Sequence, residues 1–146
     1  VLNGLDGIVD IYMPDLKYSD PDMGARLSGV PDYPECAFEA VREMHRQVGD
    51  LTLVDGIATQ GGLVRHLVLP GSVENSRGVL AFLADHLGKQ TSVNLMSQYR
   101  PAYEVPGSNR YGDIDRRITR DEYRAVAEFG HDQGLARLQT DDWIGS

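Results

Sequence analysis

The chain has 146 residues, and its 41% hydrophobic and 25% charged residues match an ordinary globular domain with one buried core. Its formal net charge of −8 argues against binding to nucleic acid or to an anionic membrane, both of which require a basic face. No apolar segment is long enough to cross a bilayer. The single cysteine, Cys36, excludes an internal disulfide and fits a reducing cytosol, so we expect a cytoplasmic protein.

The first residues, VLNGLDGIVD, lack an initiator methionine and the basic and apolar regions of a signal peptide. They lead almost at once into an apolar segment with strand character. A strand that opens a sheet leaves one edge unpaired unless further chain pairs with it. We therefore expect that Val1 marks a cut in a longer chain and that the missing chain lies on its N-terminal side.

Strand and helix patterns alternate along the sequence. Short apolar runs bounded by turn residues predict strands, and apolar residues at helical spacing before a glycine predict helices. The expected strands span residues 7–13, 63–70, 91–96 and 135–139, and a hairpin over 51–62 turns at Asp55–Gly56. The expected helices span residues 20–30 (helix or loop), 32–49, 72–88 and 119–134, and residues 97–113 form a long loop.

This alternation predicts an α/β fold with parallel strands, right-handed crossovers and flanking helices. The last helix has a clear start signal, because Thr119 and Glu122 match the T-x-x-E capping box. The composition changes only in the Pro- and Gly-rich part of the long loop. We therefore divide the chain into a core, residues 1–109, and a C-terminal helical extension of the same domain, residues 110–146.

Polar side chains lie in or just after three of the expected strands. The ligand of a parallel α/β sheet lies beyond the carboxyl ends of its strands. A lysine and an arginine can hold a carboxylate there, the arginine with two parallel hydrogen bonds, and an aspartate can accept an ammonium group or a cation. The sequence therefore predicts a pocket for a small zwitterionic or carboxylate ligand, formed by Asp15, Lys17, Arg65, Asn94, Gln98 and Tyr99.

Each of these residues also has a structural interpretation that the sequence leaves open. Asp15 would cap the following helix, Lys17 would be a solvated loop residue, and Arg65 would pair with a helix carboxylate. His66 follows Arg65 in the strand, so the two cannot face the same side, and we expect the histidine to be packed. Cys36 is expected to be a small core residue, and no histidine spacing indicates a metal site.

Four segments together resemble one known family. They are DIYMPDLKYSDP, LVRHLVLPG, VNLMSQYRPAY and RRITRDEYRAVAEFGHDQGL, in this order and spacing. They are similar to the C-terminal half of the radical S-adenosylmethionine proteins that are homologous to pyruvate formate-lyase activating enzymes. The resemblance covers nearly the whole chain. It implies an α/β fold that is the C-terminal half of a partial (β/α)6 radical-SAM barrel.

The resemblance also implies a cofactor chemistry. In this family a C-x-x-x-C-x-x-C motif of the N-terminal half binds a [4Fe–4S] cluster, whose unique iron holds S-adenosylmethionine. Reductive cleavage yields a 5′-deoxyadenosyl radical that abstracts a hydrogen atom, in activating enzymes from a glycine of a partner protein. The D-x-K motif of the family falls on Asp15 and Lys17, with the lysine near the methionine end of the cofactor. The arginine of the next strand falls on Arg65.

Three family features are absent from this sequence: the cluster cysteines, a Gly-Gly-Glu segment that binds the cofactor's amino group, and a histidine where Gln98 or Tyr99 stands. The resemblance therefore implies that the chain supplies part of an S-adenosylmethionine pocket and is inactive alone. Two alternatives remain open. One is a barrel lyase that forms a Schiff base on Lys17, and the other is a non-catalytic binding or interaction module.

Overall fold

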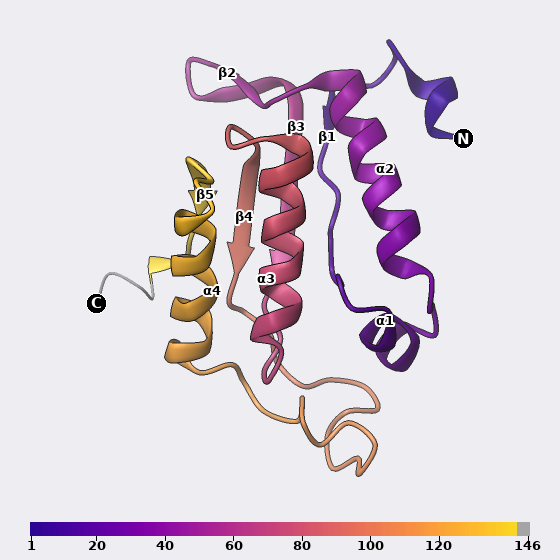
Figure 1. Cartoon of the computed structure of the whole chain (residues 1–146), viewed down its shortest axis with the longest axis vertical. Helices are drawn as coiled ribbons and strands as arrows, with labels where there is room; N and C mark the ends of the chain where they lie inside the picture. Colours follow the sequence, from indigo (N-terminus) through magenta and orange to yellow (C-terminus); the bar gives the residue numbers. More distant parts are fainter. Residues whose placement is uncertain (143–146) are drawn as a thin grey trace.

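The computed structural model describes residues 1–142 and shows one sheet covered by helices (Figure 1). The strands are β1 (Ile11–Tyr12), β2 (Thr52–Val54), β3 (Ile57–Leu67), β4 (Ser92–Met96) and β5 (Arg137–Gln139). The helices are α1 (Pro21–Ser28), α2 (Tyr33–Val48), α3 (Val73–Phe82) and α4 (Arg120–Asp132), with a 3₁₀ turn, η1 (Leu2–Leu5), and a π turn, η2 (Leu83–Leu87). The strand order is β1-β3-β4-β5 with parallel neighbours, and β2 pairs antiparallel with β3.

Helices α2, α3 and α4 cover one face of the sheet (Figure 1). Alternate strand residues point toward these helices, and Val64 and Val93 are only 2% and 0% exposed. They belong to one core with Val41 of α2, Leu80 of α3 and Val126 of α4. The predicted α/β fold with parallel strands and flanking helices is therefore confirmed.

The first expected strand is reduced to the two residues of β1, so its predicted length is wrong. Ile8 lies in the turn after η1 and is 70% exposed, and Met13 is 54% exposed on the sheet face that no described helix covers. An apolar run at the outer strand of a sheet covered on one face is buried only in part. Pairing resumes after β1, where the backbone of Arg65 bonds to the Pro14 carbonyl and to the Leu16 N–H.

The hairpin expected over residues 51–62 is confirmed, with Asp55 and Gly56 at φ values of 52° and 79° in its turn. Its second strand, however, continues into the centre of the sheet as β3. The expected hairpin strand and the second core strand are therefore one element. Gly61 allows this continuity, because its φ is 109° and an added Cβ would lie 2.3 Å from the carbonyl oxygen of Asp50.

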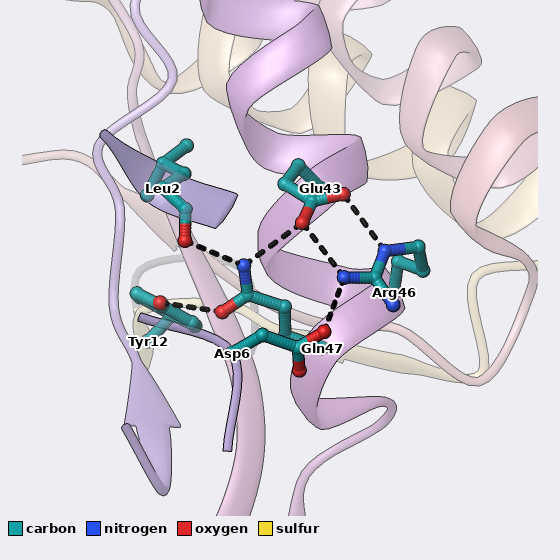
Figure 2. Close-up of polar contacts among 6 residues, drawn as sticks. All are labelled: Leu2, Asp6, Tyr12, Glu43, Arg46 and Gln47. Atoms are coloured by element: carbon teal, nitrogen blue, oxygen red, sulfur yellow. Dashed lines mark hydrogen bonds and ion pairs between the residues drawn. The ribbon is translucent and has the colours of Figure 1, made fainter. Parts of the chain in front are cut away.

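A polar network holds the start of the chain against α2 (Figure 2). The side-chain amide of Gln47 donates to the carbonyl of Leu2 and accepts from the hydroxyl of Tyr12, both at 2.8 Å. Arg46 binds the carboxylate of Asp6 at 2.6 Å. One turn of α2 thus fixes η1 and β1 together.

Glu122 secures the start of α4. Its backbone N–H binds the Thr119 side chain and its carboxylate accepts from the Thr119 N–H at 2.8 Å, so the predicted capping box is confirmed. The same carboxylate binds Arg116 at 2.7 Å and accepts from the N–H of Gly71 at 2.8 Å. Arg116 and these hydrogen bonds lower the pKa of Glu122 to about 2. One side chain therefore joins α4 to the segment before α3.

His66 is fully buried under the helices, as the sequence predicts. Its Nδ1 donates to the carbonyl of Leu16 at 2.7 Å, since a carbonyl only accepts, and its Nε2 accepts from the Ser76 hydroxyl at 2.8 Å. Burial lowers the pKa of the imidazole to about 4. The ring is therefore neutral at physiological pH.

The C-terminal part of the chain adds β5 to the same sheet, because β5 pairs in parallel with β4, and adds α4 to the helices that cover it. The division expected at residue 110 stays a prediction. Residues 143–146, the end of the expected extension, lie outside the described residues.

Replacing Glu122 with glutamine should lower the free energy of unfolding by about 1–3 kcal/mol, because Arg116 and two backbone N–H groups lose a charged acceptor. The loss is present above pH 4.5 and shrinks as the pH falls toward 2, where the native carboxylate is protonated as well. Urea unfolding measures it, with Glu128→Gln, an exposed glutamate of the same helix, as control. Equal effects of the two substitutions would contradict this role.

His66 should make the protein less stable in acid. The folded state keeps the ring neutral, whereas the unfolded chain protonates it near pH 6.5. The contribution of His66 to the free energy of unfolding is therefore fully present above pH 6.5 and declines as the pH falls toward 4. The difference in pKa corresponds to about 3 kcal/mol. Urea unfolding at several pH values should show the decline, and His66→Leu should flatten it between pH 6.5 and 5. An unchanged slope in that variant would assign the loss to other groups.

Candidate functional site

Four side chains form a row across the sheet, toward the carboxyl ends of its strands. Asp15 pairs in register with Arg65, and Arg65 pairs with Asn94. The row continues from Asn94 to Gln139 of β5. Residues in register share one face of a sheet. Three of the six predicted site residues, Asp15, Arg65 and Asn94, are thus brought together, and we call these three residues, without Gln139, the polar row.

The polar row lies on the sheet face away from the helices. Arg65 alternates along β3 with Val64 and His66, which are buried beneath the helices. The side chains of Arg65 and Asp15 are 36% and 41% exposed, and Asn94 is half-buried. The row is therefore open to a ligand at the end of the sheet where parallel α/β proteins bind them.

An ion pair is the centre of the polar row. The Nε atom of Arg65 donates to Oδ1 of Asp15 at 2.7 Å. Because both side chains are more than a third exposed, water screens the pair and it adds little to stability. Among residues 1–142 no acceptor binds the two terminal nitrogens of Arg65, which leaves them free to donate to a bound carboxylate.

Two structural alternatives for these residues are wrong. Arg65 does not pair with a helix carboxylate, because Asp15, on the neighbouring extended segment, lies on the same face and reaches it first. Asp15 does not cap the following helix, because α1 begins only at Pro21, six residues further along the chain. Asp20 is the cap of α1, and its carboxylate accepts from the N–H of Asp22 at 2.9 Å.

Lys17 lies beside the polar row. Its side chain is exposed while Leu16 and Tyr18 on either side are buried, so it points to the same side of the extended segment as Asp15. Its backbone is fixed, because its carbonyl accepts from Nδ2 of Asn75 at 3.0 Å. In the part of the chain that the structure describes, no acid pairs with its ammonium group, so that group is available to a ligand.

Gln98 and Tyr99 follow β4 and do not join the polar row. Gln98 is exposed, and its Nε2 contacts the sulfur of Met96 at 3.4 Å. Tyr99 packs against the buried core and donates its hydroxyl to the carbonyl of Ile114 at 3.0 Å. Burial raises the pKa of this phenol. Tyr99 therefore holds the long loop in place.

A cleft of about 400 Å³ lies beside Tyr99, beyond the ends of β3 and β4. We call it the tyrosine cleft, because four tyrosines are among its lining residues. The sequence predicts a long loop over residues 97–113 with Gln98 and Tyr99 in a candidate pocket, but it does not predict this cleft or the part of Arg100, Tyr103, Glu104 and Tyr111 in it. The signal was the density of aromatic and charged residues in YRPAYE, which exceeds what a connecting loop needs. Its aromatic and charged lining residues are Tyr18, Tyr99, Arg100, Tyr103, Glu104 and Tyr111.

Residues 1–142 contain no group of three or more His, Cys, Asp or Glu side chains placed to hold a metal ion. Cys36 is exposed, so its predicted place in the core is wrong; it lies on the outer side of α2, where its thiol contacts the carboxylate of Asp32 at 3.6 Å. That contact raises the pKa of the thiol. Among these same residues, no helix is both long enough and apolar enough to span a bilayer.

Comparison with known proteins finds similarity to the uncharacterized protein MJ0674 of Methanocaldococcus jannaschii, with 30% identity over 132 residues. The alignment covers 90% of this chain and 34% of the relative, so the chain spans about a third of the relative's length. No family model and no solved structure matches the chain. In that relative, the segment that is similar to most of this chain is therefore part of a longer polypeptide.

A double-mutant cycle on Asp15 and Arg65 should give a coupling free energy of about 0.2–1 kcal/mol, as expected for an exposed ion pair. The cycle uses Asp15→Asn, Arg65→Gln and the double variant, each followed by urea unfolding. A coupling of about 3 kcal/mol or more, which is typical of buried pairs, would contradict the conclusion that these charges are available to a ligand.

Proposed function

We propose that this chain is the C-terminal half of a radical S-adenosylmethionine barrel and supplies one part of its cofactor pocket. The observation that carries the proposal is the polar row of Asp15, Arg65 and Asn94 on the uncovered face of a parallel sheet. In a closed β/α barrel the helices lie outside and the opposite strand face lines the interior. In the proposed barrel, the face with the polar row would line that interior.

The polar row and Lys17 fit the amino-acid end of S-adenosylmethionine. The terminal nitrogens of Arg65 and the ammonium group of Lys17 would bind its carboxylate, and the second oxygen of Asp15 would accept from its amino group. Asn94 adds an amide that can donate or accept. Bound beside a reduced cluster, the cofactor supplies hydrogen-atom abstraction in this family. The residues of this chain bind and orient one end of it.

The cluster itself does not fit this chain. A [4Fe–4S] cluster is held by cysteine thiolates, and the only cysteine of the sequence, Cys36, is on the outer surface of α2. We therefore derive no step through the cluster and propose that the chain alone is inactive. The similarity to a third of a longer polypeptide supports the view that other chain supplies the remaining half of the barrel.

The proposal extends to setting and partners. Oxygen-sensitive clusters and a lone free thiol both suit the cytoplasm, which we propose as the location. A protein substrate, as in the activating enzymes, is proposed as the partner. The alternative Schiff-base lyase finds less support, because such a lysine is desolvated and Lys17 is exposed. A non-catalytic binding module would use the same polar row without a cluster.

The coding sequence upstream of Val1 is the first test. We expect the reading frame to continue through roughly one half-barrel, about 100–150 residues, and to encode C-x-x-x-C-x-x-C. Sequencing of the gene and mass spectrometry of the native protein measure this. A start codon directly before Val1 would overturn the proposal and favour a binding module.

In the protein translated from the longer frame, Arg65→Gln should weaken S-adenosylmethionine binding by about 10- to 100-fold, because a charged hydrogen bond to the carboxylate is lost. Equilibrium dialysis after anaerobic loading with iron and sulfide measures it. Arg124→Gln is a matched control, since Arg124 is 43% exposed, faces an aspartate at 3.9 Å and lies on α4. Equal affinities of Arg65→Gln and Arg124→Gln would show that Arg65 does not bind the cofactor.

A further inference from the structure

We propose that the tyrosine cleft binds a planar aromatic small molecule that carries both an anionic and a cationic group, the chemical class of aromatic amino acids. The cleft is lined by the helix-side residue Tyr18 and by the long loop, whereas the polar row lies on the opposite sheet face. The inference therefore goes beyond the proposed function and does not depend on it. At about 400 Å³ the cleft falls within the usual size range of small-ligand pockets.

Two tyrosines of the cleft are held in fixed positions. The Tyr18 ring is 6% exposed, and its hydroxyl hydrogen bonds with Oγ of Ser28 at 3.1 Å. The Tyr99 hydroxyl is bound to the carbonyl of Ile114. Rigid aromatic walls favour planar ligands, because little side-chain entropy is lost when a ligand ring stacks on them.

Tyr103 is the most unusual residue of the cleft. Its φ is 59°, in the left-handed region that a bulky side chain rarely adopts, and its side chain is 96% exposed. It occupies the second position of a turn closed by the Val105 N–H and the Ala102 carbonyl, where a positive φ favours glycine. Residues with strained backbone conformations cluster at ligand-binding and active sites. We assign Tyr103 to stack on the ligand ring.

The charges of the cleft select the ligand's polar groups. Arg100 and Glu104 line it, both are exposed, and neither has an ion-pair or hydrogen-bond partner within residues 1–142. A cation and an anion on one rim, not neutralising each other, are complementary to a zwitterion. The Arg100 guanidinium would bind a carboxylate and the Glu104 carboxylate would bind an ammonium group.

The loop that carries these groups is anchored before any ligand arrives. Arg26 of α1 binds both carboxylate oxygens of Asp113, at 2.9 and 2.6 Å. The carboxylate of Asp115 accepts from the N–H of Gly107 at 2.8 Å. Because the loop is already ordered, binding does not have to supply the free energy of ordering it.

Isothermal titration of the 146-residue chain with L-tryptophan tests the proposal. We expect saturable one-to-one binding at millimolar concentration or below, and clearly weaker binding of cyclohexylalanine, which has the same charges without a planar ring. Indole-3-propionate lacks the ammonium group and tryptamine lacks the carboxylate, so each should bind less tightly than L-tryptophan. No saturable binding of L-tryptophan, or equal affinity for the planar and non-planar amino acids, would overturn the proposal.

Variants then assign the contacts. Arg100→Gln should weaken L-tryptophan binding about tenfold and leave tryptamine unaffected, whereas Glu104→Gln should weaken L-tryptophan and leave indole-3-propionate unaffected. Arg42→Gln removes an exposed arginine of α2 and is the control. If Arg100→Gln and Arg42→Gln bind alike, the charge assignment is overturned.

Tyr103→Gly separates binding from folding. It should weaken L-tryptophan binding about three- to tenfold, the value of one aromatic contact, while the melting temperature stays equal or rises because glycine tolerates the turn. Unchanged affinity would exclude Tyr103 from the site. If Arg65→Gln weakens L-tryptophan binding as much as Arg100→Gln does, the ligand binds at the polar row, and its assignment to the tyrosine cleft is overturned.

Discussion

The opposite orientation of two adjacent residues, Arg65 and His66, determines the arrangement of the rest of the molecule. Both lie on β3, which pairs with β1, β2 and β4 and is the longest strand of residues 1–142. His66 points into the core, where the neutral ring links the β1 segment to α3 through Leu16 and Ser76. Arg65 must then point the other way, toward Asp15. Strand alternation thus produces one face that is buried beneath the helices and one face that carries accessible polar and charged side chains.

Both candidate sites lie toward the carboxyl ends of the parallel strands. On the uncovered face these ends place the polar row, whose charges are exposed and weakly coupled. Beyond the ends of β3 and β4, Tyr18 and the loop after β4 line the tyrosine cleft. The two sites share β4 as a support, since Asn94 belongs to one and Tyr99 follows the same strand into the other.

Local signals in the sequence were sufficient for several elements. The Asp55–Gly56 turn and the Thr119–Glu122 capping box depend on neighbouring residues only, and both are confirmed. The length of β1 depends on its position at the outer side of the sheet, which no local pattern records. The continuity of β3 depends on the close approach of Asp50 to Gly61. Both are tertiary effects, and both were predicted wrongly.

The same contrast between local signals and tertiary effects applies to the candidate site. Asp15, Arg65 and Asn94 were predicted to converge because parallel strand ends meet at one edge of a sheet, and the structure places them in one row. Tyr99 was predicted with them, but it lies past the end of β4, where packing of the loop and not strand alternation sets its direction. The tyrosine cleft was missed because its walls come from distant parts of the chain.

The ion pair between Arg26 and Asp113 has a consequence for solution conditions. It joins α1 to the long loop, yet its side chains are 36% and 53% exposed, so dissolved salt screens it readily. The hydrogen bond from the Tyr99 hydroxyl to the Ile114 carbonyl on the same loop joins uncharged groups, so salt affects it little. Raising the salt concentration should therefore loosen the outer wall of the tyrosine cleft while the sheet and its core stay intact, which makes ionic strength a selective control over one face of a folded molecule.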